Sequence, residues 1–176
     1  MVQDSIALIG FMAVGKSTVG KQLAKTLGED YRFVETDEIV ENLANKSIPE
    51  IFSEDGEKKF RELEIEACYK ASKYRKVVIS CGGGVVLNKI NIDNLKQNSI
   101  IILLEASPEN IHERVIKEGK SKRPIINNKN IKDEIRKILD FRQPFYEEAA
   151  DITVDTSNKT VDAIIKEIIQ KLKIVE

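Results

Sequence analysis

Short runs of β-branched and aliphatic residues alternate along this chain with longer stretches of mixed polar and apolar character. The short runs predict strands, and three of them are almost wholly apolar, which is typical of strands covered on both faces of a sheet. The predicted strands are Ser5–Ile9, Tyr31–Glu35, Val77–Ser80, Ile100–Leu104 and Ile152–Val154.

Between these runs, apolar residues recur every three or four positions, as in amphipathic helices, most clearly over Val161–Leu172. Ser47, followed three residues later by Glu50, predicts a helix start with a capping box. Ser107 predicts an N-cap in front of Pro108. Strands that alternate with helices throughout predict an α/β fold of three layers, in which right-handed crossovers join the strands of a parallel sheet.

The length of 176 residues suits one domain with a substantial core, and we expect a single domain over residues 1–176. The chain shows no internal repeat, low-complexity tract or linker. Its most polar stretch, Lys117–Asn130, predicts an internal loop rather than a domain boundary.

Charge and cysteine content exclude several classes of protein. Lysine and arginine number 28 against 29 aspartates and glutamates, which argues against a basic nucleic-acid-binding face. No apolar run approaches the roughly 18 residues of a membrane helix, and the first residues lack the basic segment of a signal peptide. Cys68 and Cys81 provide neither a disulfide framework nor metal-ligand spacing. We therefore expect a cytoplasmic protein that binds neither nucleic acid nor membrane.

The segment Gly10–Ser17 fits the phosphate-loop pattern G-x-x-x-x-G-K-[ST]. It follows a predicted strand and opens a predicted helix, the context in which backbone N–H groups converge on an anion. Lys16 adds a positive charge for the β- and γ-phosphates of a nucleotide, and the Ser17 hydroxyl can ligate Mg²⁺. The alternative is a glycine-rich turn without a ligand, which this context disfavours.

Two further motifs follow predicted strands, and ligands of open parallel sheets lie outside such carboxyl ends. Asp37, in Glu35–Asp37, could orient or deprotonate a hydroxyl beside the γ-phosphate, or could cap the following helix. The glycines of Cys81–Gly84 let the backbone approach a ligand closely, or simply form a tight turn. Cys81 itself suits a small buried residue better than a nucleophile.

Three arginines are candidate ligand contacts. Arg61 and Arg142 lie on or beside apolar helix faces, where an unpaired charge is costly. Each could pair with a carboxylate of this chain or hold a substrate carboxylate through a bidentate fork. Arg123 lies in a lysine-rich stretch that is either a solvated loop or a lid whose arginine swings onto phosphate.

Together these residues resemble the shikimate kinase family, and the resemblance runs from Ile6 to the final predicted helix. The blocks that carry it are Gly10–Gly20, Thr36-Asp37, Ser47–Phe52, Asp55–Glu64, Gly82–Gly84, Arg123–Ile126 and Arg142–Tyr146. The resemblance implies an ATP- and Mg²⁺-dependent kinase that phosphorylates the 3-hydroxyl of shikimate. It also implies a monomer with a five-stranded parallel sheet of order 2-3-1-4-5.

The resemblance further implies a role for each matching residue. Asp37 contacts the reacting hydroxyl, and Arg61 and Arg142 grip the substrate carboxylate. The remaining substrate contacts are Gly82, Gly83, Gly84, Phe52 and Phe60, and the substrate-binding helical segment covers about residues 37–64. The ATP contacts are Ala13, Val14, Gly15, Lys16, Ser17, Thr18, Arg114 on adenine, and Arg123 in a lid over about residues 117–129.

Two positions depart from the family pattern. Glu35 stands where an aspartate commonly reaches the water shell of the metal, so its part in the Mg²⁺ site is open. Ala13 replaces a frequent glycine of the phosphate loop and is harmless only if its φ is negative.

Three alternatives remain. The Phe-Arg, Gly-Gly-Gly and Arg-x-Pro-x-Tyr blocks count against a gluconate- or nucleotide-type kinase on the same core. The third predicted strand runs into glycines rather than an aspartate, which counts against a nucleotide-dependent switch. The presence of Lys16, Asp37 and Arg61 counts against an inactive member of the family.

Overall fold

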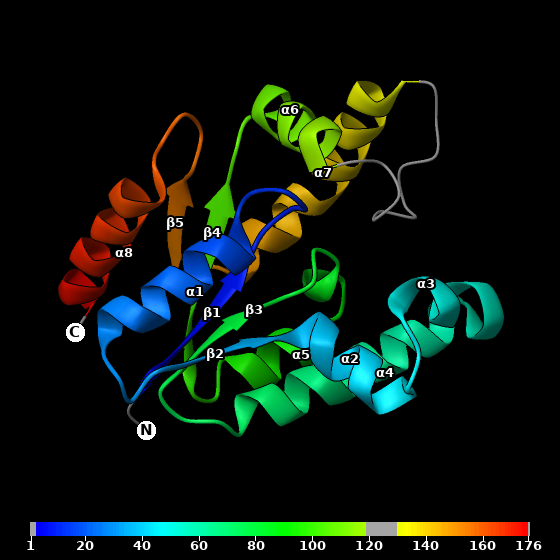
Figure 1. The fold of residues 1–176 in the computed structure, drawn as a ribbon, viewed down its shortest axis with the longest axis horizontal. Coiled ribbons are helices and arrows are strands. Elements are labelled where there is room, and N and C mark those ends of the chain that lie inside the picture. The colour runs from blue at the N-terminus through cyan, green and yellow to red at the C-terminus, as the bar shows by residue number, and fades with distance from the viewer. Residues whose placement is uncertain (1–2, 119–129, 176) are drawn as a thin grey trace.

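A five-stranded parallel sheet of order β2-β3-β1-β4-β5 forms the centre of the molecule (Figure 1). The computed structural model describes residues 3–118 and 130–175. The strands are β1 (Ser5–Ile9), β2 (Arg32–Glu35), β3 (Val77–Ser80), β4 (Ser99–Glu105) and β5 (Ile152–Asp155). Within the sheet, Ile6 of β1 lies opposite Val78 of β3 and Ile100 of β4. The predicted fold class and strand order are confirmed.

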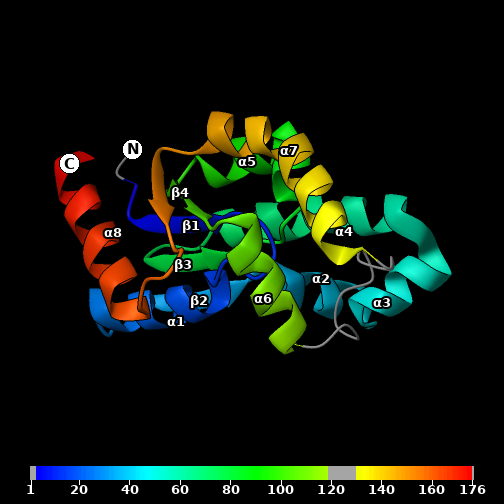
Figure 2. The ribbon, with the colours of Figure 1, turned by 90° about the horizontal axis from the view of Figure 1, so that it is seen from above.

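Helices cover both faces of the sheet (Figure 2). They are α1 (Lys16–Leu27), α2 (Thr36–Ala44), α3 (Ile48–Glu50), α4 (Gly56–Ser72), α5 (Lys89–Leu95), α6 (Pro108–Glu118), α7 (Ile131–Ala149) and α8 (Val161–Val175), with short turns of π-helix over Ile51–Asp55 and 3₁₀-helix over Val85–Leu87. One core cluster joins the sheet to α1, α6 and α8, and the other joins it to α4 and α5. α7 contributes its first turns to one cluster and its last turns to the other.

A third, smaller core lies beyond the carboxyl ends of β2 and β3, where α2, α3 and α4 project from the sheet (Figure 1). Its buried residues are Val40, Ile51, Phe60, Leu63 and Ala67. The capping box predicted at Ser47 is present and starts α3. This helical projection contains the segment 37–64 and forms one wall of the cavity described below.

The structure corrects several predicted boundaries. β2 begins at Arg32 rather than Tyr31, and β4 runs further at both ends, because it pairs with strands on both sides. Lys117 and Glu118 belong to the last turn of α6, so the predicted loop 117–130 starts later than expected. Residues 119–129, with most of the predicted lid, lie outside the described residues.

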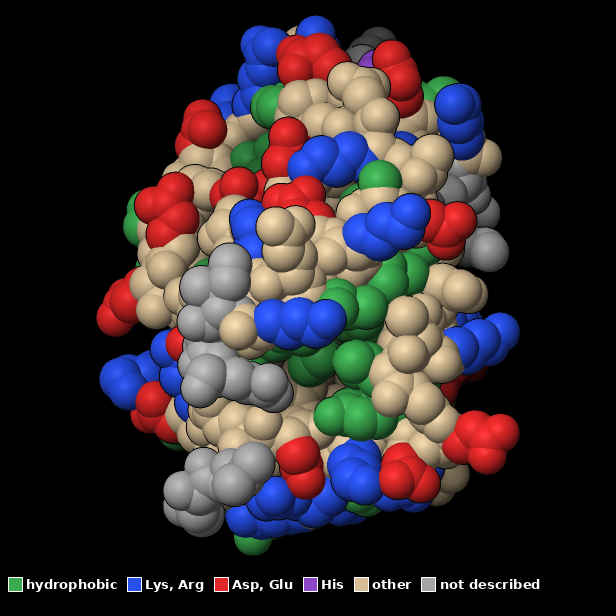
Figure 3. Space-filling model, turned by 90° about the vertical axis from the view of Figure 1, so that its left-hand side faces the viewer, with side chains coloured by type: hydrophobic (Ala, Val, Ile, Leu, Met, Phe, Trp, Pro, Cys, Tyr) green, Lys and Arg blue, Asp and Glu red, His purple; other side chains and the backbone are tan. Residues whose placement is uncertain are grey.

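The outer surface matches the balanced composition. On the face shown in Figure 3, acidic and basic side chains are interspersed around a band of apolar side chains. None of the helices within residues 3–118 and 130–175 is long and apolar enough to cross a membrane.

Gly20 allows α1 to lie close to the sheet. A Cβ at this position would lie 2.6 Å from the Phe33 ring and 3.2 Å from the Leu8 side chain. Because α1 carries the phosphate-loop lysine in its first turn, this packing also places the loop relative to the strands.

We predict that Gly20→Val lowers the free energy of unfolding by about 1–3 kcal/mol, because the added methyl groups overpack the contact with Phe33. Gln22→Val is the matched control: it places the same β-branched side chain on the exposed face of α1 and should cost about 0.5 kcal/mol or less. Urea unfolding of both variants measures the difference. Equal losses would mean that the close contact of Gly20 with Phe33 does not contribute to the effect.

Candidate active site

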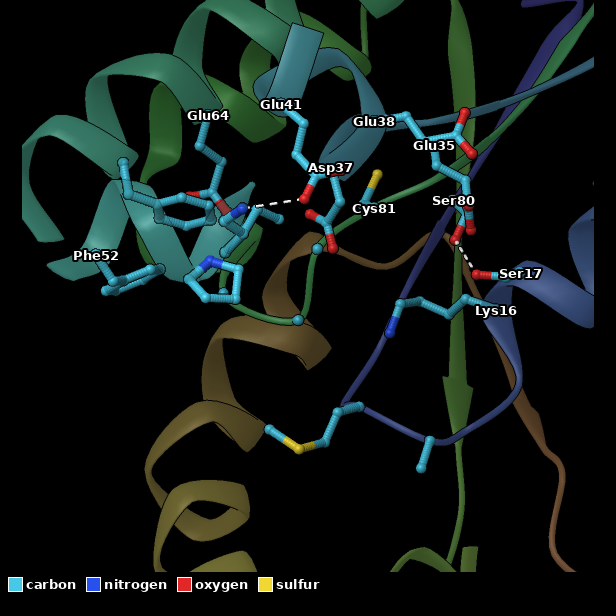
Figure 4. Close-up of a pocket in the computed structure, with 18 of the residues that line it drawn as sticks. Lys16, Ser17, Glu35, Asp37, Glu38, Glu41, Phe52, Glu64, Ser80 and Cys81 are labelled. Carbon is cyan, nitrogen blue, oxygen red and sulfur yellow. Dashed lines mark hydrogen bonds between the residues drawn. The ribbon is translucent and has the colours of Figure 1, made fainter. Parts of the chain in front are cut away.

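The loops that follow β1, β2 and β3 open onto one cavity of about 650 Å³ at the carboxyl edge of the sheet (Figure 4). Residues from α2, α4 and α7 complete its wall. The predicted site residues that line it are Ala13, Gly15, Lys16, Ser17, Thr18, Glu35, Asp37, Phe52, Phe60, Arg61, Gly82, Gly83, Gly84 and Arg142.

Three predicted site residues are not among those that line this cavity. Val14 lines a neighbouring cavity of about 440 Å³ between the phosphate loop, α6 and α7. Arg114 donates a hydrogen bond to the Ala13 carbonyl, at 3.2 Å, and is not part of the lining of the main cavity. Arg123 lies outside the described residues.

The phosphate loop turns sharply through left-handed backbone. Gly10 and Gly15 have φ values of 139° and 101°, which glycine adopts without strain. Ala13 also has a positive φ, 60°, so the condition under which alanine would be harmless here is not met. A left-handed alanine costs roughly 1–2 kcal/mol, which the rest of the loop must offset. Lys16 Nζ donates to the Gly10 and Phe11 carbonyls, both at 2.8 Å.

The groups around Ser17 suit a hard divalent cation bound together with phosphate. The Ser17 hydroxyl lies 3.5 Å from the Ser80 hydroxyl, and the Glu35 carboxylate lines the same cavity (Figure 4). Among the described residues, no group of three or more His, Cys, Asp or Glu side chains could hold a metal by itself. This donor set fits Mg²⁺, which takes one or two protein oxygens and completes its shell with phosphate and water.

Asp37 faces the cavity from the first turn of α2. Glu35 occupies the N-cap position, so the interpretation of Asp37 as the cap of this helix is wrong. Desolvation by the enclosing protein raises the pKa of the Asp37 carboxyl above 3.8, Lys16 opposes this shift, and the negative charges of Glu35 and Glu41 add to it. A carboxylate with a raised pKa is a better proton acceptor.

Arg61 has carboxylate partners in its own chain. Its guanidinium donates to Glu64 Oε2 at 2.9 Å and to Glu57 Oε1 at 3.2 Å. Glu64 is only 2% exposed, and its other oxygen, Oε1, is buried with no hydrogen-bond partner among the described residues. Burial raises the pKa of the Glu64 carboxyl, and Arg61 counteracts this. Glu64 is not among the predicted site residues, although its place three residues after Arg61 in an otherwise apolar stripe was the available signal.

Arg142 reaches the cavity from the buried face of α7 and is 6% exposed. It donates to the Gly83 carbonyl at 3.1 Å, and the buried Tyr146 hydroxyl donates to the same oxygen. The Arg142 Nε group is buried and has no hydrogen-bond partner among the described residues. Tyr146 is a second residue to which the sequence analysis assigned no role, because only the fold brings it to the glycine loop.

The three consecutive glycines meet different neighbours. A Cβ at Gly84 would lie 2.5 Å from the Arg61 guanidinium, and one at Gly82 would lie 2.8 Å from Asp37 Oδ1. At Gly83 the nearest atom would be the Met12 nitrogen at 3.5 Å, an ordinary contact. The loop is therefore glycine at Gly82 and Gly84 because functional side chains approach it, and not only because the chain turns.

The remaining wall is apolar. The Phe52 and Phe60 rings pack with centroids 4.7 Å apart. Cys81 is 2% exposed, and burial raises the pKa of its thiol to about 12, so it stays protonated, as expected of a small buried residue rather than a nucleophile.

The cavity therefore combines a phosphate loop, a carboxylate suited to accept a hydroxyl proton, and a buried arginine with an unsatisfied donor. This arrangement can bind a nucleotide at one end and an anionic alcohol at the other, with Asp37 between them.

The chain is similar to known proteins over most of its length. The shikimate kinase family model matches residues 12–173. A shikimate kinase of Caldanaerobacter subterraneus subsp. tengcongensis is 45% identical over 166 residues, 94% of each chain. The structure of shikimate kinase from Acinetobacter baumannii in complex with shikimate superposes with a TM-score of 0.91 at 29% identity, over 98% of this chain and 94% of that one. Shikimate kinase from Aquifex aeolicus gives a TM-score of 0.78 at 35% identity, over 96% of both chains.

We predict that Asp37→Asn raises the melting temperature at neutral pH. The folded-state pKa of Asp37 lies above its unfolded value, so keeping this carboxylate ionised in the fold opposes stability. The gain should shrink as the pH falls toward 3.8, where the wild-type carboxyl takes up its proton. Glu38→Gln, which removes a charge from the neighbouring position of the same helix turn, is the matched control and should give no gain. Thermal unfolding at several pH values measures both. An equal rise in the control would assign the effect to the helix end instead.

Proposed function

The chain belongs to the shikimate kinase family, and from this premise we propose how its own residues carry out the reaction. It is an ATP-dependent kinase that transfers the γ-phosphate of ATP to the 3-hydroxyl of shikimate, giving shikimate 3-phosphate and ADP in the pathway to chorismate and the aromatic amino acids. This excludes the gluconate-kinase, nucleotide-kinase and switch alternatives. We propose that it acts as a cytoplasmic monomer in one domain.

The observation that carries the acceptor site is the pair of buried, unsatisfied polar groups on Arg142 and Glu64. A buried polar group without a partner is costly, and both side chains line the cavity, so a ligand that binds there can supply the missing partner once the side chain turns toward it. Arg142 Nε is a donor that a carboxylate would satisfy, and Glu64 Oε1 is an acceptor for a hydroxyl. Shikimate supplies both chemistries. Arg61, held by Glu64, adds a second positive charge to the carboxylate site.

The ATP site is proposed on the phosphate loop. The N–H groups that open α1 would bind phosphate oxygens, and Lys16 would give its charge to the β- and γ-phosphates. Ser17 would hold Mg²⁺ directly and Glu35 through water, and bound Mg²⁺ supplies neutralisation of the phosphate charge. Thr18 is exposed and lines the same cavity, and we propose that it contacts the nucleotide. The contact of Arg114 with adenine stays a prediction.

Transfer depends mainly on positioning. Asp37 accepts the proton of the 3-hydroxyl while the hydroxyl oxygen forms its bond to the γ-phosphorus. The bond between that phosphorus and the bridging oxygen of ADP breaks at the same time, and Lys16 stabilises the charge on the equatorial oxygens. The Phe52 and Phe60 rings exclude water from the acceptor side. Arg123, proposed to close over the phosphate, lies outside the described residues, as does most of the proposed lid.

A coupled ADP-release assay tests this function. With ATP and Mg²⁺ we expect release that depends on shikimate and not on gluconate or nucleoside monophosphates. Asp37→Asn should lower kcat by about 10²- to 10⁴-fold, the usual contribution of a positioned base. Glu62→Gln, at an exposed position of α4 outside the lining of the cavity, should retain activity. ADP release that is indifferent to shikimate would contradict the function, and an active Asp37→Asn variant would contradict the role of the carboxylate.

We further predict that Gly84→Ala lowers kcat/KM for shikimate and that Gly83→Ala does not. The new Cβ at Gly84 would displace the Arg61 guanidinium, and a shift of about 1 Å in a positioning group can cost roughly 100-fold in kcat/KM for shikimate. The melting temperature should change little, because the displaced atoms are the end of a flexible side chain. Gly83→Ala has only ordinary contacts and should keep wild-type kinetics.

Steady-state kinetics with each substrate varied, together with thermal unfolding, separates these outcomes. Similar kcat/KM losses in both variants would mean that the glycine loop acts through its backbone and not through the room it leaves for Arg61.

A further inference from the structure

Thr156 follows the last residue of β5 and is completely buried, and in the sequence it is far from the phosphate loop. Its hydroxyl lies 3.1 Å from the Val14 carbonyl of the phosphate loop and 2.8 Å from the Glu105 carbonyl at the end of β4. The contact with Val14 joins residues 142 positions apart in the sequence. No motif of the sequence analysis includes Thr156.

The hydroxyl matters more for Val14 than for Glu105. A threonine hydroxyl has one proton to donate. The Glu105 carbonyl already accepts the Thr156 backbone N–H at 2.8 Å. The hydroxyl is closer to the Glu105 carbonyl, but that oxygen keeps the Thr156 backbone N–H as a donor when the hydroxyl is removed, so the Val14 carbonyl is the one whose contact with Thr156 depends on the side chain.

Arg114 holds the preceding carbonyl of the loop from the same side. One of its terminal nitrogens donates to the Ala13 carbonyl at 3.2 Å and lies 3.3 Å from the Thr156 hydroxyl. The other donates to the Thr156 carbonyl at 3.0 Å. Two successive carbonyls of the phosphate loop are thus bound by one network.

Because of the geometry of the peptide bond, the direction of these two carbonyls also fixes the direction of the N–H groups that follow them. In a trans peptide the C=O and the following N–H point in opposite directions, and the described residues contain no cis peptide. Holding the carbonyls of Ala13 and Val14 on the side of Thr156 and Arg114 therefore aims the N–H groups of Val14 and Gly15 the opposite way. The loop needs such support, because Ala13 has a left-handed conformation that alanine disfavours.

We propose that Thr156 is a positioning residue for ATP: its hydroxyl fixes the Val14 peptide so that the N–H groups of the phosphate loop converge on the phosphates. This inference rests on the proposed function, in which ATP binds on this loop. It deepens that function by assigning part of nucleotide affinity to a side chain that does not contact the nucleotide.

Thr156→Val and Thr156→Ser test the proposal. Valine keeps the volume and removes the hydroxyl, whereas serine keeps the hydroxyl. Losing one hydrogen bond that orients the loop should raise KM for ATP in Thr156→Val by about three- to tenfold. KM for shikimate should stay at the wild-type value, and Thr156→Ser should restore KM for ATP. Titration calorimetry with ADP should show the same loss of affinity in Thr156→Val without turnover.

A merely structural role would lower the melting temperature without separating the two substrates. The proposal is overturned if Thr156→Val binds ADP like the wild type, if KM for ATP and shikimate rise together, or if Thr156→Ser is as impaired as Thr156→Val. If Thr156→Val does not fold, Thr156→Ala replaces it and must meet the same criteria. Wild-type activity with ATP and shikimate is measured alongside, so that failure of the proposed function shows in the wild type and failure of this inference shows only in the variants.

Discussion

The parallel pairing of β1 with both β3 and β4 is the constraint on which the rest of this structure depends. Because all the strands point the same way, the phosphate loop, the turn at Asp37 and the glycine loop all leave the sheet at one edge. The apolar faces of the strands need cover on both sides, which α1 and α8 provide on one side and α4 and α5 on the other. The topology of the sheet therefore creates the site. It makes neighbours of three loops that are distant in the sequence, and no contact between the loops is needed to bring them together.

The two arginines in the acceptor half of the cavity have hydrogen-bond partners within the protein. Arg61 is neutralised by Glu57 and Glu64, while Arg142 binds the Gly83 carbonyl and keeps a further donor unsatisfied. Leaving buried polar groups unpaired and carboxyl pKa values raised opposes folding. The large apolar clusters on the two faces of the sheet offset this cost. Stability therefore comes from the layers, while Glu64 and Arg142 each keep a buried, unsatisfied polar atom in the wall of the cavity.

Side chains from outside the phosphate loop support its conformation. Its left-handed residues turn the chain, but Ala13 does so against its own preference. Arg114 of α6 and Thr156 after β5 bind its outward carbonyls. Elements outside the phosphate loop thereby contribute to the direction of its N–H groups. The same principle applies at the glycine loop, where Tyr146 and Arg142 share the carbonyl of Gly83.

The sequence by itself determined the α/β class, the five strands to within one residue at each end, the phosphate loop and most residues that line the cavity, because these depend on local periodicity and on short motifs. The family resemblance added the strand order. Only the tertiary structure decided that Asp37 faces the cavity instead of capping α2, and that Ala13 is left-handed. It also decided that Glu64, Tyr146 and Thr156 support the site. Their partners lie on other elements or across the loop, and the burial that gives a polar contact its strength exists only once the layers have packed.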